Sequence, residues 1–508
     1  MRRLINVPGI TLVIFFLWKV ALLLFTAQPV PSNDAFFYDG PVVNYLLHGK
    51  YCNPAIAPVL PISGNEVFSA YPPLYQAVLL GWMKCFGTTA LAAMWLHVVL
   101  LGGFALIVGK IFQQLQVSAS AANLGGLFLF GITFHDRPDT LAHGLGALAI
   151  LALVRGLTWP SAVFLLLTFG TSLQIGGIYS LWAAALVLTS VWLGQCKFPW
   201  GPGALFFAAF VGLVAWVKLG HPHWWEGFRE HVRITPSFTG FRIPAVDDVL
   251  KVLRTAPGIL IGFAGFIALV TPQKNLLEQI SRSPQLLVAG CGSMAALALI
   301  GGCLFVLTPN AIHIAGYLQP IIVGCLFGTV FGEPQRSRVN KLMPPLFVAA
   351  ALLVSVRAIG MTTWGVLCAR DVSYRQAVPR LNQELDALPA GATVLVSSAY
   401  LYEAAQRTNL AWIHSDWPNH AASHDGGITA IEELKPARLM LTQFDYYRRF
   451  EPVVAQFRER HKEVAVRITN LAQLPSPEAR PATRKVIQHI SWAPVVVEFS
   501  WPSAGQSR

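Results

Sequence analysis

Long runs of apolar residues recur from Ile10 to about Val356, separated mostly by short polar loops. The runs are solid rather than alternating, which predicts membrane-spanning helices instead of the strands of a membrane barrel. We therefore predict a polytopic α-helical membrane protein with about eleven spans. The predicted spans are residues 10–25, 89–111, 119–134, 140–156, 159–176, 177–194, 202–219, 256–272, 286–308, 312–332 and 343–365.

One further apolar stretch, residues 72–86, suits either a short span or a helix lying along the membrane surface. Loop charge decides between them, because cytoplasmic loops carry an excess of lysine and arginine. If 72–86 does not cross, most basic loops fall inside and the two aspartate-bearing segments fall outside. We therefore expect a juxtamembrane helix over 72–86, with a cytoplasmic N-terminus and an extracytoplasmic C-terminus in a bacterial inner or plasma membrane. The deciding basic positions are Lys110, Arg155, Lys197, 274–282 and 336–341.

After Arg370 the composition becomes that of a soluble domain, in which short strands alternate with helices. This order predicts a small α/β domain. We expect a membrane unit over residues 1–369, whose first outer loop (28–88, here the first loop) carries juxtamembrane helices, and a C-terminal domain over 370–508. The predicted strands are 393–397, 438–442, 464–468 and 495–499, and the predicted helices are 374–388, 401–406 and 446–461.

The composition of the chain argues against two classes of function, nucleic-acid binding and metal binding by paired cysteines. The 508-residue chain is 54% hydrophobic and only 12% charged, about half the charged fraction of a soluble protein. Its net charge of +12 is explained by lysine and arginine in loops that set membrane topology, so nucleic acid is not expected as a partner. The seven cysteines form no CxxC pair of the kind that binds metal. Their spacing leaves open whether Cys52 and Cys85 pair.

Carboxylates at a bilayer boundary are costly to keep there and often mark a functional site. The first such group is Asp34 and Asp39, which precede a predicted helix from about Gly40 to Gly49. A carboxylate near the membrane surface suits a general base for a hydroxyl acceptor, and Asp34 is our candidate. The alternative is that Asp34 only caps the helix. Asp39 is expected to be a solvated partner on the same turn.

The second group lies in His135–Thr140, a tight turn between two predicted spans. Arg137 suits a phosphate group because its guanidinium is always charged and holds its donors in a fixed fork. Asp136 or Asp139 would then hold the geometry of the site. The structural alternative is that Asp139 caps the next helix and Asp136 pairs with Arg137.

Two pairs of aromatic positions complete the candidate set. Tyr71 and Tyr75 flank the paired prolines that open the 72–86 helix, where proline fixes an abrupt entry. His313 and Tyr317 lie one helical turn apart on one face, at the outer end of the span 312–332. Either pair could line a site or could be purely architectural.

Read together, these segments resemble the GT-C glycosyltransferases, the superfamily of the protein O-mannosyltransferases and the lipid A aminoarabinose transferase. The resemblance is clearest over residues 8–180 and extends in layout to 365. The family's common Asp-Glu pair corresponds here to Asn33-Asp34. The ordered features behind it are Asp34 after the first span, the Pro72-Pro73-Leu74-Tyr75 helix, the Arg137-Pro138-Asp139 turn, the late His313 and Tyr317, and the final α/β domain.

The resemblance implies a sugar donor linked to polyprenyl phosphate, transfer on the outer face of the membrane with inversion, and Asp34 as the catalytic acidic residue. The implied partners are this donor, the membrane, and a lipid, glycan or protein acceptor. No cofactor is implied, and relatives differ on whether a divalent metal takes part. The predicted substrate-binding residues are Asp39, Tyr71, Tyr75, Asp136, Arg137, Asp139, His313 and Tyr317.

Two other classes of function stay open. One is a membrane transporter or lipid flippase, and the other is an inactive or scaffolding relative of the glycosyltransferases. The chain shows no internal repeat and no paired interrupted helices near mid-membrane, which argues against a transporter. Its ionisable residues cluster toward one face of the membrane, which suits chemistry at a surface.

Overall fold

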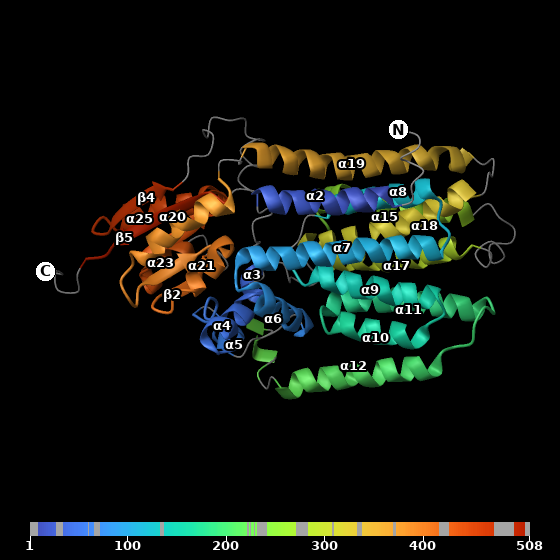
Figure 1. The fold of residues 1–508 in the computed structure, drawn as a ribbon, viewed down its shortest axis with the longest axis horizontal. Coiled ribbons are helices and arrows are strands. Elements are labelled where there is room, and N and C mark those ends of the chain that lie inside the picture. The colour runs from blue at the N-terminus through green and yellow to red at the C-terminus, as the bar shows by residue number, and fades with distance from the viewer. Residues whose placement is uncertain are drawn as a thin grey trace.

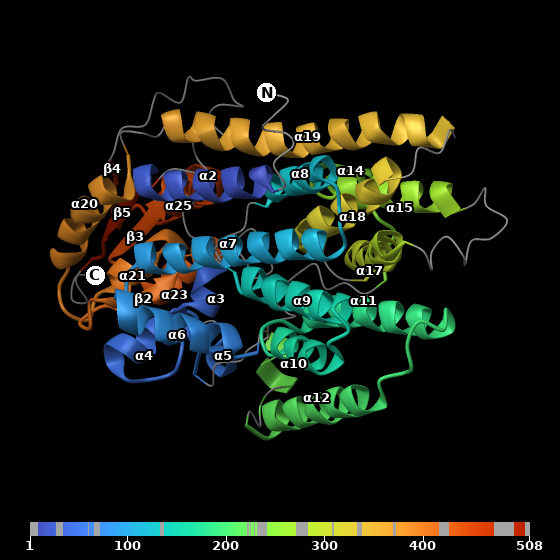
Figure 2. The same ribbon diagram turned by 45° about the vertical axis from the view of Figure 1, so that its right-hand side comes forward.

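The computed structural model has two parts, a bundle of long helices and a sheet domain at one end of it (Figure 1). The helices run roughly along one direction, and the C-terminal domain lies beyond their ends rather than beside them (Figures 1 and 2). The structure describes residues 9–26, 34–58, 60–65, 72–132, 137–220, 223, 225–227, 229–230, 241–270, 283–306, 309–332, 338–368, 372–415, 426–471 and 492–502.

The bundle is held together by apolar side chains on almost every face of its inner helices. Helix α7 packs against α2 on one side and α9 on another, and α17 packs against α11 and α18. Its core is one large cluster of buried aliphatic and aromatic residues. The helices are α2 (Ile10–Thr26), α7 (Ala90–Gln114), α8 (Ala119–Leu127), α9 (Asp139–Val154), α10 (Thr158–Phe169), α11 (Leu173–Trp192), α12 (Trp200–Gly220), α14 (Val246–Thr255), α15 (Pro257–Val270), α17 (Pro284–Phe305), α18 (Gln319–Gly332) and α19 (Arg338–Cys368), with 3₁₀ turns η1 (Phe128–Gly131) and η2 (Pro309–Tyr317).

Four of these helices are long and apolar enough to cross a membrane: α7, α11, α17 and the Pro344–Trp364 part of α19. The number rises to six if two bent pairs each count as one span, α14 with α15 at 83° and η2 with α18 at 42°. The other apolar helices, such as α9 and α10, are shorter. This supports an integral membrane protein, whereas the eleven-span count stays a prediction.

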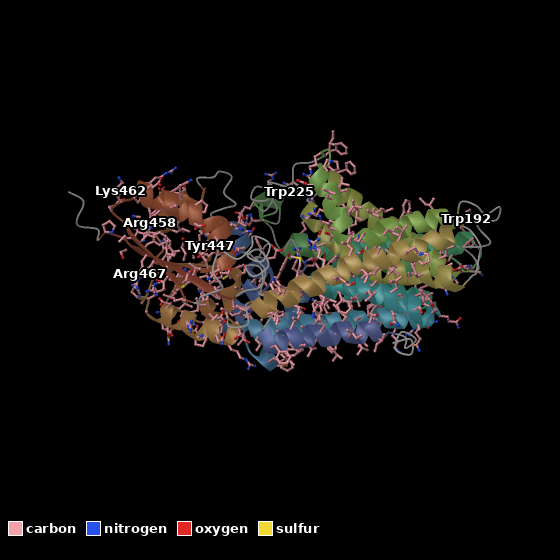
Figure 3. The ribbon with its side chains drawn as sticks, turned by 90° about the horizontal axis from the view of Figure 1, so that it is seen from above. Trp192, Trp225, Tyr447, Arg458, Lys462 and Arg467 are labelled. Atoms are coloured by element: carbon pink, nitrogen blue, oxygen red, sulfur yellow. The ribbon has the colours of Figure 1, made fainter. Side chains whose placement is uncertain are left out.

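Two exposed tryptophans mark the two ends of the bundle. Trp225 lies at the end next to the C-terminal domain and Trp192 at the opposite end (Figure 3). Tryptophan is enriched where a membrane protein crosses the interface between lipid and water. Arg458, Lys462 and Arg467 lie on the C-terminal domain, away from the bundle (Figure 3). This distribution fits a bilayer around the bundle with the C-terminal domain in water.

The first loop forms short helices at the same end of the bundle as the C-terminal domain (Figure 2). Helix α4 ends at Gly49, whose φ of 71° is the left-handed conformation that glycine adopts easily at a helix end. The predicted end of this helix is therefore confirmed. The predicted 72–86 helix is present as α6, only 13 residues long. These helices are α3 (Ala35–Tyr38), α4 (Gly40–His48), α5 (Pro61–Asn65) and α6 (Leu74–Phe86).

The C-terminal domain contains a five-stranded sheet in the order β2-β1-β3-β5-β4. Strands β1, β2 and β3 are parallel, whereas β5 is antiparallel to both β3 and β4. The predicted strands are confirmed within one or two residues, but β2 and α23 were not predicted. The elements are α20 (Tyr374–Asp386), β1 (Thr393–Val396), α21 (Leu401–Ala405), β2 (Ala411–His414), α23 (Gly426–Leu434), β3 (Arg438–Thr442), α25 (Glu451–Arg460), β4 (Ala465–Asn470) and β5 (Pro494–Ser500).

The two faces of this sheet pack against different partners. Side chains alternate along a strand, so Leu395 of β1 faces one way, into a core with α23 and α25. Its neighbours Val394 and Val396 face the other way, into a core that also contains Phe36 and Leu79 of the first loop. The first loop and the C-terminal domain therefore share one hydrophobic core.

Candidate functional site

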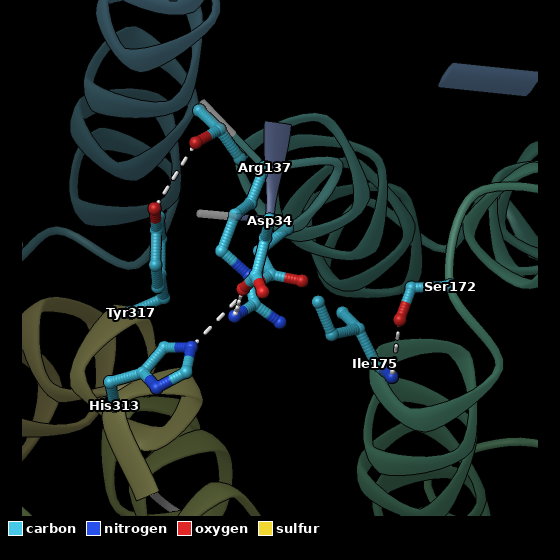
Figure 4. A network of polar contacts seen from close by, with 8 residues as sticks. Asp34, Arg137, Ser172, Ile175, His313 and Tyr317 are labelled. Carbon is cyan, nitrogen blue, oxygen red and sulfur yellow. Dashed lines mark hydrogen bonds and ion pairs between the residues drawn. The ribbon is translucent and has the colours of Figure 1, made fainter. Parts of the chain in front are cut away.

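The two aspartate-bearing segments, far apart in sequence, meet in space. Arg137, just before α9, places Nη1 2.5 Å from Oδ2 of Asp34 in the first loop. Its Nε lies 2.9 Å from Oδ2 of Asp139, the first residue of α9. One guanidinium therefore forms ion pairs with two carboxylates, and its charge is permanent because arginine stays protonated in proteins. Figure 4 shows this bridge with Asp34 and Arg137 at its centre.

The two carboxylates of this bridge differ in exposure. The Asp139 side chain is 0% exposed, and that of Arg137 is 12% exposed. His313 of η2 adds a second contact, with Nε2 3.5 Å from Oδ2 of Asp139. A buried carboxylate needs such partners, because an uncompensated charge away from water is strongly destabilising. Asp139 therefore anchors Arg137 from within the bundle.

Asp34 lies at the open end of this network, because 40% of its side chain is exposed. It occupies the position before α3, but its side chain makes no capping hydrogen bond. The residue before the predicted Gly40–Gly49 helix is instead Asp39, which also makes no side-chain cap. The capping alternative for Asp34 is therefore wrong. Part of this carboxylate therefore stays open to solvent beside the Arg137 guanidinium.

Tyr317 continues the network into the bundle. Its hydroxyl lies 3.1 Å from Oγ1 of Thr140, the residue after Asp139. Its ring stacks on the imidazole of His143, one turn further along α9, at 4.2 Å and 3°. His313 and Tyr317 thus both contact the first turn of α9. The predicted span begins later than expected, at Gln319, because residues 309–317 form the 3₁₀ turn η2 and not the first turns of an α-helix. The contacts with Thr140 and His143 were not foreseen.

The ion pairs among Asp34, Arg137, Asp139 and His313 are called here the first cluster. Asp39 belongs to a second group of polar residues, called here the closed cluster because it is shielded from solvent. It is only 1% exposed, and it accepts hydrogen bonds from Tyr75 at 3.1 Å and from Tyr402 at 2.7 Å. The Tyr75 hydroxyl also lies 3.0 Å from Nε2 of His97 in α7. The expectation that Asp39 is solvated is therefore wrong, because tyrosines from α6 and from the C-terminal domain enclose it.

Burial raises the pKa of Tyr402 well above its ordinary value, and the neighbouring Asp39 carboxyl raises it further. The hydroxyl therefore stays protonated and acts as a donor to Asp39 at any physiological pH. Tyr402 lies in α21, a segment in which sequence reasoning placed no functional residue. No local pattern marks it, because its partner is 363 positions away.

Tyr38 lies between the two clusters. The Arg137 guanidinium carbon lies 5.9 Å from the centre of the Tyr38 ring. The same ring meets that of Tyr75 edge-on at 6.4 Å. The Tyr38 ring therefore joins the first cluster to the closed cluster. It belongs to α3, the short helix between Asp34 and Asp39.

Two predicted residues, Tyr71 and Asp136, lie outside the described residues. Within the described part of the chain, no group of three or more His, Cys, Asp or Glu side chains is arranged to hold a metal ion. Cys52 and Cys85, whose pairing the spacing left open, are both free thiols.

No protein-family model matches the chain, and no curated protein matches it either. Solved structures do match. ArnT from Cupriavidus metallidurans bound to undecaprenyl phosphate is 12% identical, with a TM-score of 0.51 over 96% of this chain and 97% of that one. The archaeal oligosaccharyltransferase AglB from Archaeoglobus fulgidus, with an inhibitory peptide and a dolichol-phosphate, is 11% identical, with a TM-score of 0.50 over 88% and 70%.

The apo form of the Archaeoglobus fulgidus oligosaccharyltransferase gives a TM-score of 0.51 at 11% identity, over 88% of this chain and 71% of that one. These neighbours are GT-C superfamily members. The likeness therefore shows that this chain has a GT-C-like fold, as the ordered motifs predict. At such low identity it is a likeness of fold alone.

Proposed function

We propose that this protein is a membrane glycosyltransferase, which moves a sugar from a polyprenyl-phosphate donor to an acceptor hydroxyl on the outer face of the membrane. The observation that carries the proposal is the ion-paired chain from Asp139 through Arg137 to the partly exposed Asp34. The fold supports the same class, because solved structures that share it hold undecaprenyl phosphate or a dolichol-phosphate.

In this proposal Asp34 is the general base. Its carboxylate takes the proton of the acceptor hydroxyl while the acceptor oxygen attacks the anomeric carbon. The bond from that carbon to the phosphate oxygen breaks on the opposite side of the ring. The polyprenyl phosphate therefore leaves with the bonding electron pair, and the configuration of the sugar inverts.

Arg137 stabilises the negative charge on the leaving phosphate. A guanidinium is suited to this role because its hydrogen bonds to phosphate are charge-assisted and directional. The buried carboxylate of Asp139 forms an ion pair with the guanidinium and so fixes the position of Arg137 before a substrate binds. The site thus holds a carboxylate that can take the acceptor proton beside a cation that can stabilise the leaving phosphate.

The location of the site supports transfer at a membrane surface. Asp34 directly precedes α3, which lies at the end of the bundle that carries the C-terminal domain (Figure 1). The loop charges predict that this end faces outward. The lipid donor would then be taken from the outer leaflet, with its phosphate at the level of Arg137.

The test is glycosyl transfer by purified protein in lipid vesicles. Undecaprenyl phosphates that carry labelled hexoses or pentoses are offered together with an envelope extract from cells lacking the protein. We expect the label to move to an acceptor while free undecaprenyl phosphate accumulates in equal amount, with wild type but not with Asp34→Asn. Transbilayer movement of chemically unchanged donor, without transfer of any sugar in the panel, would establish the flippase alternative instead.

A further inference from the structure

The carboxyl ends of the three parallel strands β1, β2 and β3 meet at one edge of the sheet, called here the carboxyl edge. In open α/β sheets, ligands bind at this edge, where neighbouring strands connect in opposite directions. The edge is polar here: Ser397 donates to Asp445 at 2.6 Å, and Oγ of Ser398 lies 3.0 Å from Nε2 of His414. It thus has the composition of a binding edge.

The carboxyl edge is covered by the protein's own first loop. The backbone N–H of His414, the last residue of β2, donates to the carbonyl of Ala55 at 2.9 Å. The ring of Phe36, which is fully buried, lies 4.0 Å from the His414 imidazole. A segment of the first loop therefore occupies the place at which related sheets bind a ligand.

Tyr402 extends this contact to the polar centre of the first loop. It lies in α21, which follows β1 and starts at the same edge. Its hydroxyl donates to Oδ2 of Asp39, while Tyr75 donates to Oδ1. Asp39 is thereby held from the C-terminal domain on one side and from α6 on the other.

A single turn of helix links Asp39 to the proposed base. The N–H of Phe37 donates to the carbonyl of Asp34 at 2.9 Å, and the N–H of Asp39 donates to that of Ala35 at 2.8 Å. The turn is therefore closed by hydrogen bonds at both ends. Because these bonds join the backbones of the two aspartates, we expect a shift of Asp39 to move the backbone of Asp34 and hence its carboxylate.

We propose that the C-terminal domain binds the first loop at its carboxyl edge as it would bind a ligand, and that Tyr402 is a positioning residue for Asp34. Transfer then depends on the docked state of the C-terminal domain, because Tyr402 acts on Asp34 through Asp39. This inference rests on the proposed function for its kinetic part and on geometry alone for the docking itself.

Tyr402→Phe tests the inference, with Tyr400→Phe as the matched control. Tyr400 is also fully buried and donates its hydroxyl at 2.6 Å, but to the carbonyl of Trp492 within the C-terminal domain. Both variants delete one buried hydrogen bond from the same segment. We expect Tyr402→Phe to lower kcat about 10-fold with the donor KM unchanged, since even a 1 Å misplacement costs about 10²-fold. Tyr400→Phe should keep kcat.

Hydrogen exchange supplies a readout that needs no substrate. The amides of Phe37, Asp39 and Val43 should exchange faster in Tyr402→Phe than in wild type, and at the wild-type rate in Tyr400→Phe. Equal kcat and equal exchange in the two variants would overturn the inference. If wild type transfers no sugar, the proposed function fails, while exchange still decides the docking. Should Tyr402→Phe not fold, Phe36→Leu removes another contact of the carboxyl edge and must give the same result.

Discussion

Asp34 and Asp39 lie at the two ends of one helical turn, and they differ in solvent exposure and in the kind of side chain that they contact. The Asp34 side chain is 40% exposed and meets the guanidinium of Arg137. Asp39 is 1% exposed and meets the hydroxyls of Tyr75 and Tyr402. Residue type and proximity in sequence therefore do not distinguish the two aspartates, whereas exposure and the nature of the partner do.

The difference has a physical basis. A general base must come within hydrogen-bond reach of the proton that it removes. Asp34 can do so as it stands, because part of its side chain faces solvent. Asp39 would first have to give up hydrogen bonds from two tyrosines and leave the buried Tyr402 hydroxyl without this acceptor, at a cost of about 1–3 kcal/mol, whereas Tyr75 would keep its contact with His97. In the proposed function, this difference assigns the reaction to Asp34 and a positioning role to Asp39.

The largest expected effect is the loss of turnover in Asp34→Asn. The substitution keeps the size of the side chain but removes the base, so turnover should fall by about 10²–10⁴-fold. Stability should fall by only about 0.2–1 kcal/mol, the usual worth of an ion pair with a partly exposed partner. Turnover of labelled donor and thermal unfolding of the same preparation measure the two effects.

Asp39→Asn is the matched substitution for this comparison. Wild-type turnover in Asp34→Asn beside an inactive Asp39→Asn would move the base to Asp39 and reverse the assignment of the two roles. Equal losses in both would remove the distinction between reaction and position.

The next effect concerns Arg137, the link between the exposed and buried ends of the first cluster. Arg137→Gln removes the cation beside the fully buried Asp139. Removing one partner of a buried ion pair costs about 3–5 kcal/mol, because the other charge stays uncompensated. We expect a lower melting temperature together with lost turnover. In the double variant Arg137→Gln/Asp139→Asn, much of the stability but none of the turnover should return.

A smaller effect is expected for stability in Asp39→Asn. The amide keeps one acceptor oxygen but turns a donor toward one of the two tyrosines, whose hydroxyl must then rotate to accept. The loss should be about 1 kcal/mol, the net worth of one hydrogen bond, with turnover lowered about 10-fold through misplacement. Unfolding in denaturant measures the first quantity, and initial rates measure the second. A stability loss confined to Asp34→Asn would contradict the comparison.

Much of the first cluster could be predicted from the sequence, because the predicted membrane topology places its residues on one face of the membrane. Asp34, Arg137 and His313 each lie where a predicted span ends, and loop charge assigns those ends to one face. The contacts among them follow once the helices pack. The span count is harder to predict, because α9 and α10 have only 16 and 12 residues. Composition alone does not show how such short helices sit in a bilayer.

The closed cluster could not be predicted, since its partners come from three distant segments. Asp39, Tyr75 and Tyr402 carry no shared pattern, and the hydrogen bond to Tyr402 spans 363 positions. Strand β2 was not predicted from the sequence for a related reason. Its four residues, Ala411–His414, are too few to show a period, and they form a strand because β1 pairs with them.

The smallest effect is a pH dependence in α21, at the boundary of the closed cluster. Burial raises the pKa of Glu403, the neighbour of Tyr402, above the ordinary glutamate value, although a hydrogen bond from Tyr374 opposes the shift. A group whose folded pKa is raised contributes stability below its unfolded pKa, near 4.3. This contribution is lost as the pH rises through the folded value, at no more than about 1.4 kcal/mol per pH unit.

Glu403→Gln removes this titration and keeps an oxygen that accepts from Tyr374. Relative to wild type, the variant should therefore gain stability as the pH rises from 4 toward 7, with turnover nearly unchanged because Asp39 keeps its tyrosines. Melting temperatures of both proteins across this range measure the effect, and Tyr400→Phe, which leaves the carboxyl in place, should follow wild type. A constant difference at every pH would show that Glu403 titrates normally, and that α21 is more open to water than its burial indicates.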